Sequence, residues 1–247
     1  MIRVILVLIE VILFLVLGSP LLLVEWLIGK INPALKDRSC LALVNWVFGC
    51  IIRTAGVTTI VRGEDRIPQD TAVLYVGNHR SYFDVLLTYV RVPRPTGYVA
   101  KKEMLKYPIL RVWMRNLHCL FLDRNNIKEG LKTILAAVEL VKSGISVTIF
   151  PEGTRNRVPD TFLPFHDGSF KIAEKGGVPV VPITIVNSGA IFEDHMPFIR
   201  KTTVVIEYGE PIYLDQLDKE TRKHLGTYVS SIIQKTYFEN KKLLQKS

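Results

Sequence analysis

The chain has 247 residues, of which 48% are apolar, and its mean hydropathy is +0.23. This composition excludes a disordered or collagen-like chain, and the length suits one α/β domain with or without an appendage. Thirty-two basic against 23 acidic residues give a net charge of +9, which favours an anionic partner: a membrane surface, nucleic acid or a phosphorylated substrate. The three cysteines lack C-x-x-C spacing, which argues against a disulfide scaffold or a structural zinc site.

The first 55 residues are rich in apolar side chains. Residues 11–24 are uncharged, and a second apolar stretch covers residues 40–52. A membrane-spanning helix needs about 20 apolar residues, so the first stretch is borderline and the second is too short to span alone. Pro20 predicts a kink, and Asn32-Pro33 predicts a turn between the stretches. We expect residues 1–55 to form a two-helix hairpin that embeds in one leaflet; a single span, a signal peptide and buried core helices are the alternatives.

The remainder, residues 56–247, alternates short apolar runs with helical patterns. Runs typical of strands recur at residues 57–61, 72–76, 98–100, 119–122, 146–150, 180–186 and 203–208. Several are apolar at successive positions, as in strands buried on both faces. Helical spacing of apolar residues covers 127–142, and a second helical pattern covers 217–238. The alternation predicts an α/β domain with a mixed, largely parallel central sheet of about seven strands flanked by helices.

A histidine and an aspartate follow the second predicted strand, in the run NHRSYFD (78–84). On one helix, His79 and Asp84 would lie about 140° apart, so they meet only if His79 precedes the helix. Ser81 and Asp84 match a capping box, which predicts Ser81 as the N-cap and leaves His79 in the preceding turn. A carboxylate fixes the tautomer of a neighbouring imidazole, so the pattern indicates a general acid–base pair. The alternative is structural: a capping aspartate beside a polar turn.

Further motifs stand at the ends of other predicted strands. Residues 91–124 hold eight basic and two acidic side chains, most of which we assign to a solvated surface. Arg124 directly follows the strand in FLDR (121–124), where a guanidinium can hold a phosphate through two hydrogen bonds. The run VPVVPI (178–183) contains prolines that cannot donate within a sheet, and we expect it to form an apolar wall.

The run FPEGTRN (150–156) follows the fifth predicted strand. Its proline ends the strand, and Gly153 allows a tight turn that can aim backbone amides and the Thr154 hydroxyl at an anion. Arg155 adds positive charge at the same place. Glu152 can orient an arginine or bind a substrate hydroxyl. The alternative is an ordinary turn with a surface ion pair.

These four segments, in this order, resemble the glycerolipid acyltransferases, and within them the lysophosphatidic acid (1-acyl-sn-glycerol-3-phosphate) acyltransferases. The resemblance spans roughly residues 70–190 and is carried by NHRSYFD, FLDR, FPEGTRN and VPVVPI. Each motif is weak alone, whereas their order and their positions at strand ends make the set specific.

The resemblance implies transfer of an acyl group from acyl-carrier protein or acyl-coenzyme A to the 2-hydroxyl of lysophosphatidic acid, giving phosphatidic acid. It implies direct transfer, without a metal or a bound cofactor. His79 would be the general base and Asp84 would orient it. The acceptor would be bound by Arg124, Glu152, Gly153, Thr154, Arg155 and Lys101. The enzyme would sit on the lipid bilayer, with its site at the cytoplasmic face of the inner membrane.

Other functions stay open on the residues alone. The charge permits nucleic-acid binding, but no nucleic-acid-binding module appears, and we expect no such partner. A lipid or thioester hydrolase could use the same His–Asp pair on water, although G-x-S-x-G is absent. An acyltransferase for glycerol 3-phosphate or another lysophospholipid would use the same cations. A non-catalytic lipid-binding protein is the simplest alternative.

Overall fold

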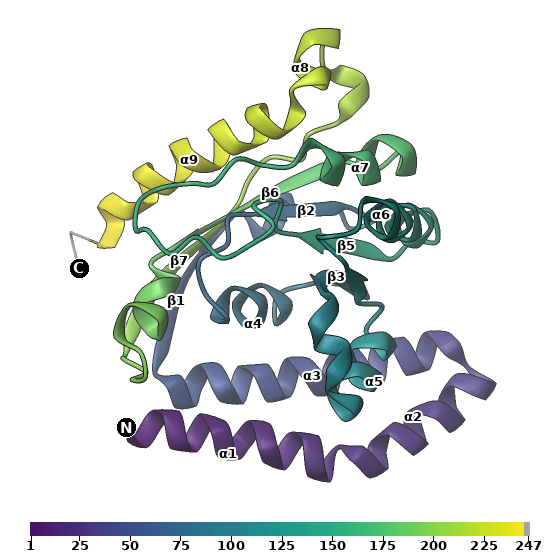
Figure 1. Ribbon diagram of the computed structural model, residues 1–247, viewed down its shortest axis with the longest axis vertical. Helices are drawn as coiled ribbons and strands as arrows, with labels where there is room; N and C mark the ends of the chain where they lie inside the picture. Colours follow the sequence, from purple (N-terminus) through teal and green to yellow (C-terminus); the bar gives the residue numbers. More distant parts are fainter. Residues whose placement is uncertain (245–247) are drawn as a thin grey trace.

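The computed structural model describes residues 1–244 and contains a seven-stranded sheet with helices on both faces (Figure 1). The strands are β1 (Val57–Arg62), β2 (Leu74–Gly77), β3 (Thr96–Lys101), β4 (Leu120–Leu122), β5 (Ser146–Ile149), β6 (Val180–Val186) and β7 (Thr202–Tyr208). Their order is β1-β7-β6-β2-β5-β3-β4, and neighbouring strands are parallel except β6 with β7. The predicted mixed, largely parallel sheet is confirmed.

Helices cover both faces of this sheet. On one face, α3 (Pro33–Ala55) and α4 (Phe83–Tyr89) share a core with β2, β6 and β7. The other face carries α6 (Ile127–Lys142), α7 (Lys171–Gly176) and α9 (Leu225–Leu244). The remaining helices and 3-10 turns are α5 (Pro108–Asn116), α8 (Lys219–Lys223), η1 (Glu64–Arg66), η2 (Lys102–Lys106), η3 (Asp167–Phe170), η4 (Ser188–Ile191), η5 (Glu193–His195) and η6 (Leu214–Gln216).

The predicted helices are present, with one division. The helix predicted over 127–142 has the bounds of α6, because its apolar side chains keep one spacing throughout. The pattern predicted over 217–238 is divided into α8 and α9, which meet at His224. Asp218 caps α8 by accepting from the amides of Glu220 and Thr221, each at 2.9 Å.

The N-terminal segment forms three helices instead of the expected two: α1 (Ile2–Leu17), α2 (Ser19–Ile31) and α3. The axes of α1 and α2 differ by 48°. Pro20 has no N–H to donate to the Val16 carbonyl, and the Ser19 hydroxyl donates to that carbonyl instead, at 2.7 Å. The predicted turn is present, and Asn32 caps α3 by accepting from the Leu35 amide at 3.0 Å. The hairpin therefore has one bent arm and one straight arm.

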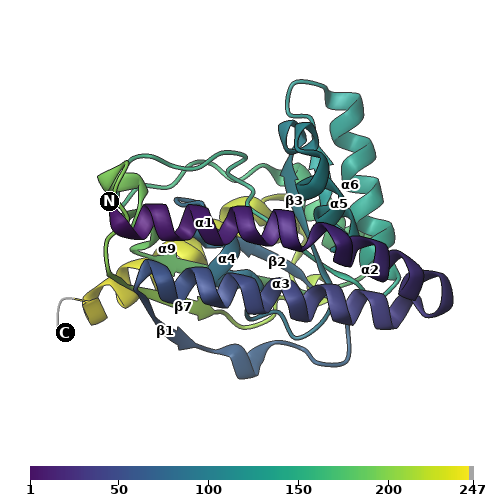
Figure 2. The same ribbon diagram turned by 90° about the horizontal axis from the view of Figure 1, so that it is seen from below.

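This hairpin is attached to the domain through α3. In Figure 2, which shows the molecule from below, α1 and α3 run side by side in front of the sheet. Glu10 on α1 accepts from Thr54 at 2.5 Å, and Glu25 on α2 accepts from Ser39 at 2.7 Å, so two carboxylates hold the bent arm against α3. The inner side of α3 is buried in the core. The division of the chain at residue 55 stays a prediction.

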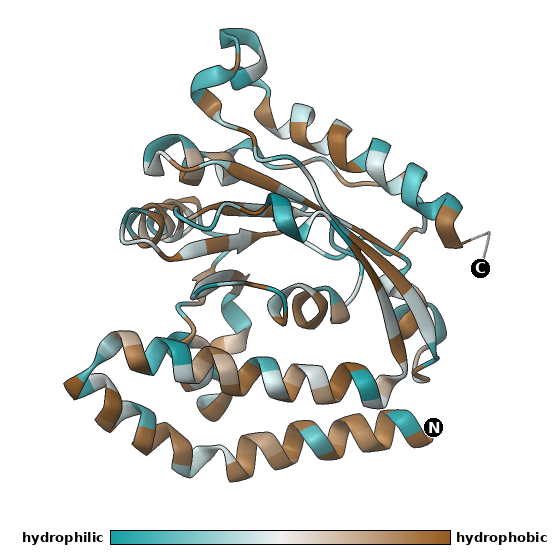
Figure 3. Ribbon diagram, turned by 180° about the vertical axis from the view of Figure 1, so that it is seen from behind, coloured by the Kyte–Doolittle hydropathy of each residue, from teal (hydrophilic) through white to brown (hydrophobic). Residues whose placement is uncertain are grey.

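The outer surface of the hairpin is apolar. α1 and α2 are coloured as hydrophobic along most of their length in Figure 3, and Ile5, Leu8 and Ile12 are each about half exposed. Within residues 1–244, no single helix has the length and hydropathy of a membrane span. In this part of the chain, only α1 and α2 taken together are long and apolar enough, and they are bent relative to each other.

The burial of β6 yields a stability prediction. Ile183 is 2% exposed in the middle of the sheet. Ile183→Ala leaves a cavity there, so we expect it to lower the free energy of unfolding by about 2–5 kcal/mol, measured by urea unfolding in detergent. The matched control is Val158→Ala at a side chain that is 58% exposed, with a change within about 0.5 kcal/mol. Equal losses in the two variants would contradict the assigned core.

Candidate active site

The candidate site lies where the parallel neighbours β2 and β5 end. Beyond β2 the chain turns through Asn78 and His79 into α4, and beyond β5 it continues into residues 150–156. Because both carboxyl ends lie at one edge of the sheet, the two motifs come together. Asn78 is buried and exchanges two hydrogen bonds of 2.9 Å with the backbone of Ile185 on β6. The turn that carries His79 therefore starts from a fixed point.

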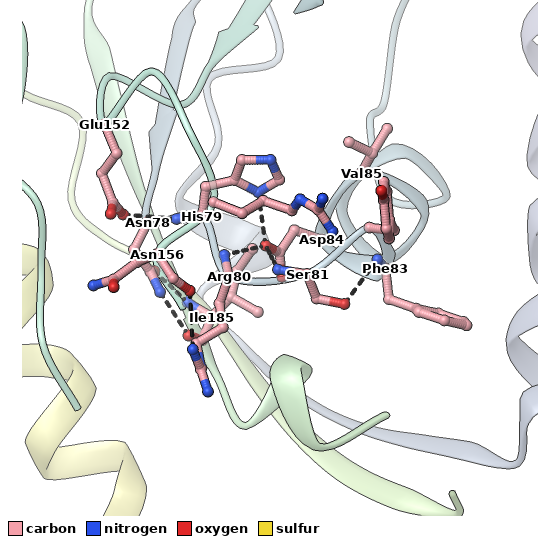
Figure 4. Close-up of polar contacts among 12 residues, drawn as sticks. Asn78, His79, Arg80, Ser81, Phe83, Asp84, Val85, Glu152, Asn156 and Ile185 are labelled. Atoms are coloured by element: carbon pink, nitrogen blue, oxygen red, sulfur yellow. Dashed lines mark hydrogen bonds and ion pairs between the residues drawn. The ribbon is translucent and has the colours of Figure 1, made fainter. Parts of the chain in front are cut away.

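His79 and Asp84 are in contact, as their spacing predicts (Figure 4). His79 Nδ1 lies 2.8 Å from Asp84 Oδ2, and that oxygen also accepts from the backbone amides of Arg80 and Ser81, each at 2.7 Å. Asp84 is fully buried, whereas the His79 side chain is 17% exposed. The imidazole stacks on Phe150 with ring centroids 4.3 Å apart. Within residues 1–244, His79 Nε2 has no hydrogen-bond partner, so it is available to a reacting group.

The helix after this turn begins one residue later than predicted. Its N-cap is Tyr82 instead of Ser81. Asp84 makes one half of the capping box by accepting from the Ser81 amide, but the Ser81 hydroxyl accepts from Phe83 at 3.0 Å. The same hydroxyl donates to Glu193 at 2.6 Å. The Asp84 carboxylate thus bonds to the whole turn, including the imidazole, and not to the helix end alone.

The backbone of His79 is held at both of its polar atoms. Its N–H donates to Glu152 Oε1, and its carbonyl accepts from the Asn156 amide, both at 2.8 Å (Figure 4). Glu152 Oε2 accepts from the Leu163 amide at 3.3 Å. Burial raises the pKa of Glu152 to about 7, although the two backbone donors lower it. Both carboxylate oxygens of Glu152 are thus bonded to backbone, so this side chain fixes the His79 turn.

A cavity of about 960 Å³ adjoins the segment after β5, and neither His79 nor Asp84 is among its lining residues. Phe150 connects the cavity with the His79 turn, because its ring lines the cavity and also stacks on the imidazole. Gly153 has a φ of +69°, and a Cβ there would lie 3.3 Å from His166, so glycine suits the bend at the rim. The polar lining includes the predicted residues Arg124, Glu152, Gly153 and Thr154, and the apolar lining includes Val99, Leu122, Leu131, Ile134, Leu135 and Ile149.

Arg155 and Lys101 lie outside the lining of this cavity. The Arg155 guanidinium lies 3.5 Å from the centre of the Tyr82 ring and donates to Glu193 at 3.0 Å. Lys101 pairs with Glu103 at 3.0 Å and lines a neighbouring pocket of about 530 Å³. The predicted acceptor-binding residues therefore do not share one pocket: Lys101 lies in the smaller pocket, and Arg155 lies against Tyr82 and Glu193.

Arg124 connects the cavity with the smaller pocket, because it lines both. In the described part of the chain its guanidinium has no hydrogen bond or ion pair, and it is exposed. Desolvation lowers the pKa of Arg124, but an arginine keeps its charge in proteins. This cation is available to an anionic ligand.

The segment 178–183 leads into the central strand β6 and does not line the large cavity. It lies between β2 and β7, where the Pro182 carbonyl accepts from the Gly209 amide at 2.8 Å. The apolar wall that we assigned to it is supplied largely by α6.

Glu193, on η5, is a site residue that the sequence analysis missed. It contacts Ser81, Tyr82 and Arg155, which belong to two of the motifs. Glu193 lies more than 35 residues from both motifs in the sequence, so no local pattern predicts the contact, and only the fold shows it.

Part of the chain matches a known family model. The model described as Acyltransferase covers residues 58–186. The 1-acyl-sn-glycerol-3-phosphate acyltransferase of Borreliella burgdorferi is 29% identical over 198 residues, covering 80% of this chain and 76% of that protein. The protein of the same name from Haemophilus influenzae is 30% identical over 210 residues, covering 83% of this chain and 84% of that one.

A solved structure has the same fold. The crystal structure of the 1-acyl-sn-glycerophosphate (LPA) acyltransferase PlsC from Thermotoga maritima aligns with a TM-score of 0.78 and 23% identity, over 96% of this chain and 95% of that chain. The chain spans about half the length of the plant relatives from Cocos nucifera and Brassica napus.

The buried carboxyl group of Glu152 yields a pH prediction. Its pKa rises from an ordinary 4.5 to about 7 on folding, so ionisation disfavours the folded state as the pH rises through this range. Glu152→Gln lacks this titration. We therefore expect the melting temperature of the variant, relative to that of the wild type, to increase from pH 4.5 to pH 8. Thermal unfolding at several pH values measures the difference, and a difference that is independent of pH would contradict the assigned burial.

Proposed function

Since the chain belongs to the acyltransferase family and is therefore an acyltransferase, we propose that it acylates the 2-hydroxyl of lysophosphatidic acid to give phosphatidic acid. The relatives that carry this activity in their names support the choice of acceptor. The main structural support is the His79–Asp84 pair. His79 Nε2 has no hydrogen-bond partner among residues 1–244, and the imidazole stacks on Phe150, which lines a large, mainly apolar cavity.

In the proposed reaction, His79 is the general base. Because Asp84 Oδ2 only accepts, it favours a proton on Nδ1 and leaves the Nε2 lone pair for the substrate hydroxyl. As Nε2 takes the hydroxyl proton, the alkoxide oxygen attacks the thioester carbonyl carbon. The C–S bond then breaks, and the thiolate receives the proton from Nε2. Asp84 stabilises the imidazolium between these steps.

Binding of the two substrates divides between the cavity and the cations. The apolar wall formed by Leu131, Ile134 and Leu135 suits an acyl chain, and the exposed Arg124 at its rim suits a phosphate. Arg155 and Lys101 are the other proposed phosphate ligands. The acyl donor is a thioester of acyl-carrier protein or of coenzyme A, and both of these carry phosphate groups.

We propose that the apolar surface of α1 and α2 embeds in one leaflet of the inner membrane, at its cytoplasmic face. Acceptor and product are both lipids, so a bilayer has to reach the site. The net charge of +9 complements anionic lipid headgroups, at about 1 kcal/mol for each basic residue near the surface.

Steady-state kinetics of detergent-solubilised protein test the reaction. We expect the wild type to form phosphatidic acid from lysophosphatidic acid and a long-chain acyl thioester. His79→Ala removes the base and lowers kcat by about 10²–10⁴-fold. Arg155→Ala removes a charge-assisted contact and raises the KM for lysophosphatidic acid about tenfold or more. Arg66→Ala, at a guanidinium paired with Glu207 and Glu210, is the matched control and leaves both constants unchanged.

Other outcomes of this assay identify the alternatives. Free fatty acid without phosphatidic acid would indicate a hydrolase. If product forms only from glycerol 3-phosphate or another lysophospholipid, that molecule is the acceptor instead of lysophosphatidic acid. If His79→Ala has the kinetic constants of the wild type, the proposal that His79 is the general base is wrong.

Vesicle flotation tests the membrane surface. Leu8 and Ile12 are 54% and 58% exposed on α1. Leu8→Gln with Ile12→Gln removes two apolar anchors, so we expect binding to vesicles with anionic lipid to weaken at least about tenfold. The control pair is Tyr228→Gln with Val158→Gln, at side chains 37% and 58% exposed that lie outside the hairpin. Equal weakening by both pairs would contradict a membrane surface on the hairpin.

A further inference from the structure

One carboxylate outside the four motifs joins the His79 turn to Arg155. Glu193 Oε1 accepts from the Tyr82 amide at 2.7 Å and from Arg155 Nη1 at 3.0 Å, and Oε2 accepts from the Ser81 hydroxyl at 2.6 Å. The Glu193 side chain is only 14% exposed. Three donors from two separate segments thus share one carboxylate.

These contacts fix the guanidinium of Arg155 on two sides. Its face lies over the Tyr82 ring at 3.5 Å, and one nitrogen is held by Glu193. A guanidinium has five N–H donors, and Glu193 takes one in the described part of the chain. The Arg155 side chain is 25% exposed, so further donors can reach a ligand.

The next residue strengthens the same connection. Asp194 pairs with Arg80 at 2.5 Å, and Arg80 also donates to the Asn156 carbonyl at 2.9 Å. Two successive acidic residues of η5 therefore bind the turn after β2, and both have a link to the segment after β5. These contacts of Glu193 and Asp194 hold the His79 turn and the Arg155 segment together.

We propose that Glu193 is a positioning residue, which holds Arg155 to receive the phosphate of the acyl acceptor at a fixed distance from His79. The inference rests on the proposed function, in which Arg155 binds that phosphate. Orienting a guanidinium in advance removes part of the entropy cost of binding and places the acceptor hydroxyl for His79. Glu193 itself touches no reacting atom.

A double-mutant cycle separates this role from a general structural one. Glu193→Gln keeps an oxygen for the Tyr82 amide and an amide group that can donate to Ser81, so it removes chiefly the charge facing Arg155. We expect Glu193→Ala to raise the KM for lysophosphatidic acid about tenfold and Glu193→Gln to raise it less, with the thioester KM unchanged. In an Arg155→Ala background, Glu193→Gln should change the acceptor KM less than about twofold.

Glu210→Gln is the matched control. Glu210 is exposed and pairs with Arg66 at 3.2 Å beyond the far end of β7, so the acceptor KM should stay at the wild-type value. Thermal unfolding of each variant checks that it is folded.

The equilibrium dissociation constant of a short-chain lysophosphatidic acid, below its micelle concentration, is measured for the same set. An equal effect of Glu193→Gln with and without Arg155 would overturn the proposal, as would a lower KM or Kd once the charge is gone. If the wild type makes no phosphatidic acid while the coupling appears in Kd, the proposed reaction fails and the positioning role stands. If neither binding nor turnover depends on Glu193, the positioning role fails.

Discussion

The site depends on one buried oxygen atom, Oδ2 of Asp84. The imidazole of His79 and the amides of Arg80 and Ser81 all converge on it within 2.8 Å. The same interaction therefore shapes the turn and sets the tautomer of the ring. Because Asp84 is fully buried, loss of its carboxylate would leave amides without an acceptor, so the chemistry of the pair and the local fold are coupled.

Two carboxylates, Glu152 buried and Glu193 partly buried, join this turn to distant parts of the chain. Glu152 binds the His79 amide from the segment after β5, and Glu193 binds Ser81 and Tyr82 from the segment after β6. These hydrogen bonds hold in place a turn that lies at the edge of the sheet. Burial carries an electrostatic cost, visible in the raised pKa of Glu152, which the backbone donors offset only in part. The arrangement is consistent with a site whose geometry has to be fixed before substrate binds.

The sequence predicts those features that depend on local pattern. Seven apolar runs correspond to the seven strands, and α6 follows its 3.6-residue spacing, because burial on a sheet or a helix face selects residues at regular intervals. The contact between His79 and Asp84 is also local. By contrast, the separation of Arg155 from the large cavity and the contact with Glu193 depend on where loops after different strands meet. That meeting is set by the strand order, which no single segment encodes.

The acidic residues of the apolar hairpin show how it is tied to the site. Glu10 and Glu25 accept hydrogen bonds from Thr54 and Ser39 on α3. These two carboxylates therefore lie in the contact between the two arms, and large apolar side chains are exposed on the outer surface. α3 in turn shares a core with α4, whose first turn contains Asp84. If the hairpin embeds in a leaflet as proposed, the depth of α1 and α2 sets the height of the His79 turn above the lipid through the packing of α3 against α4.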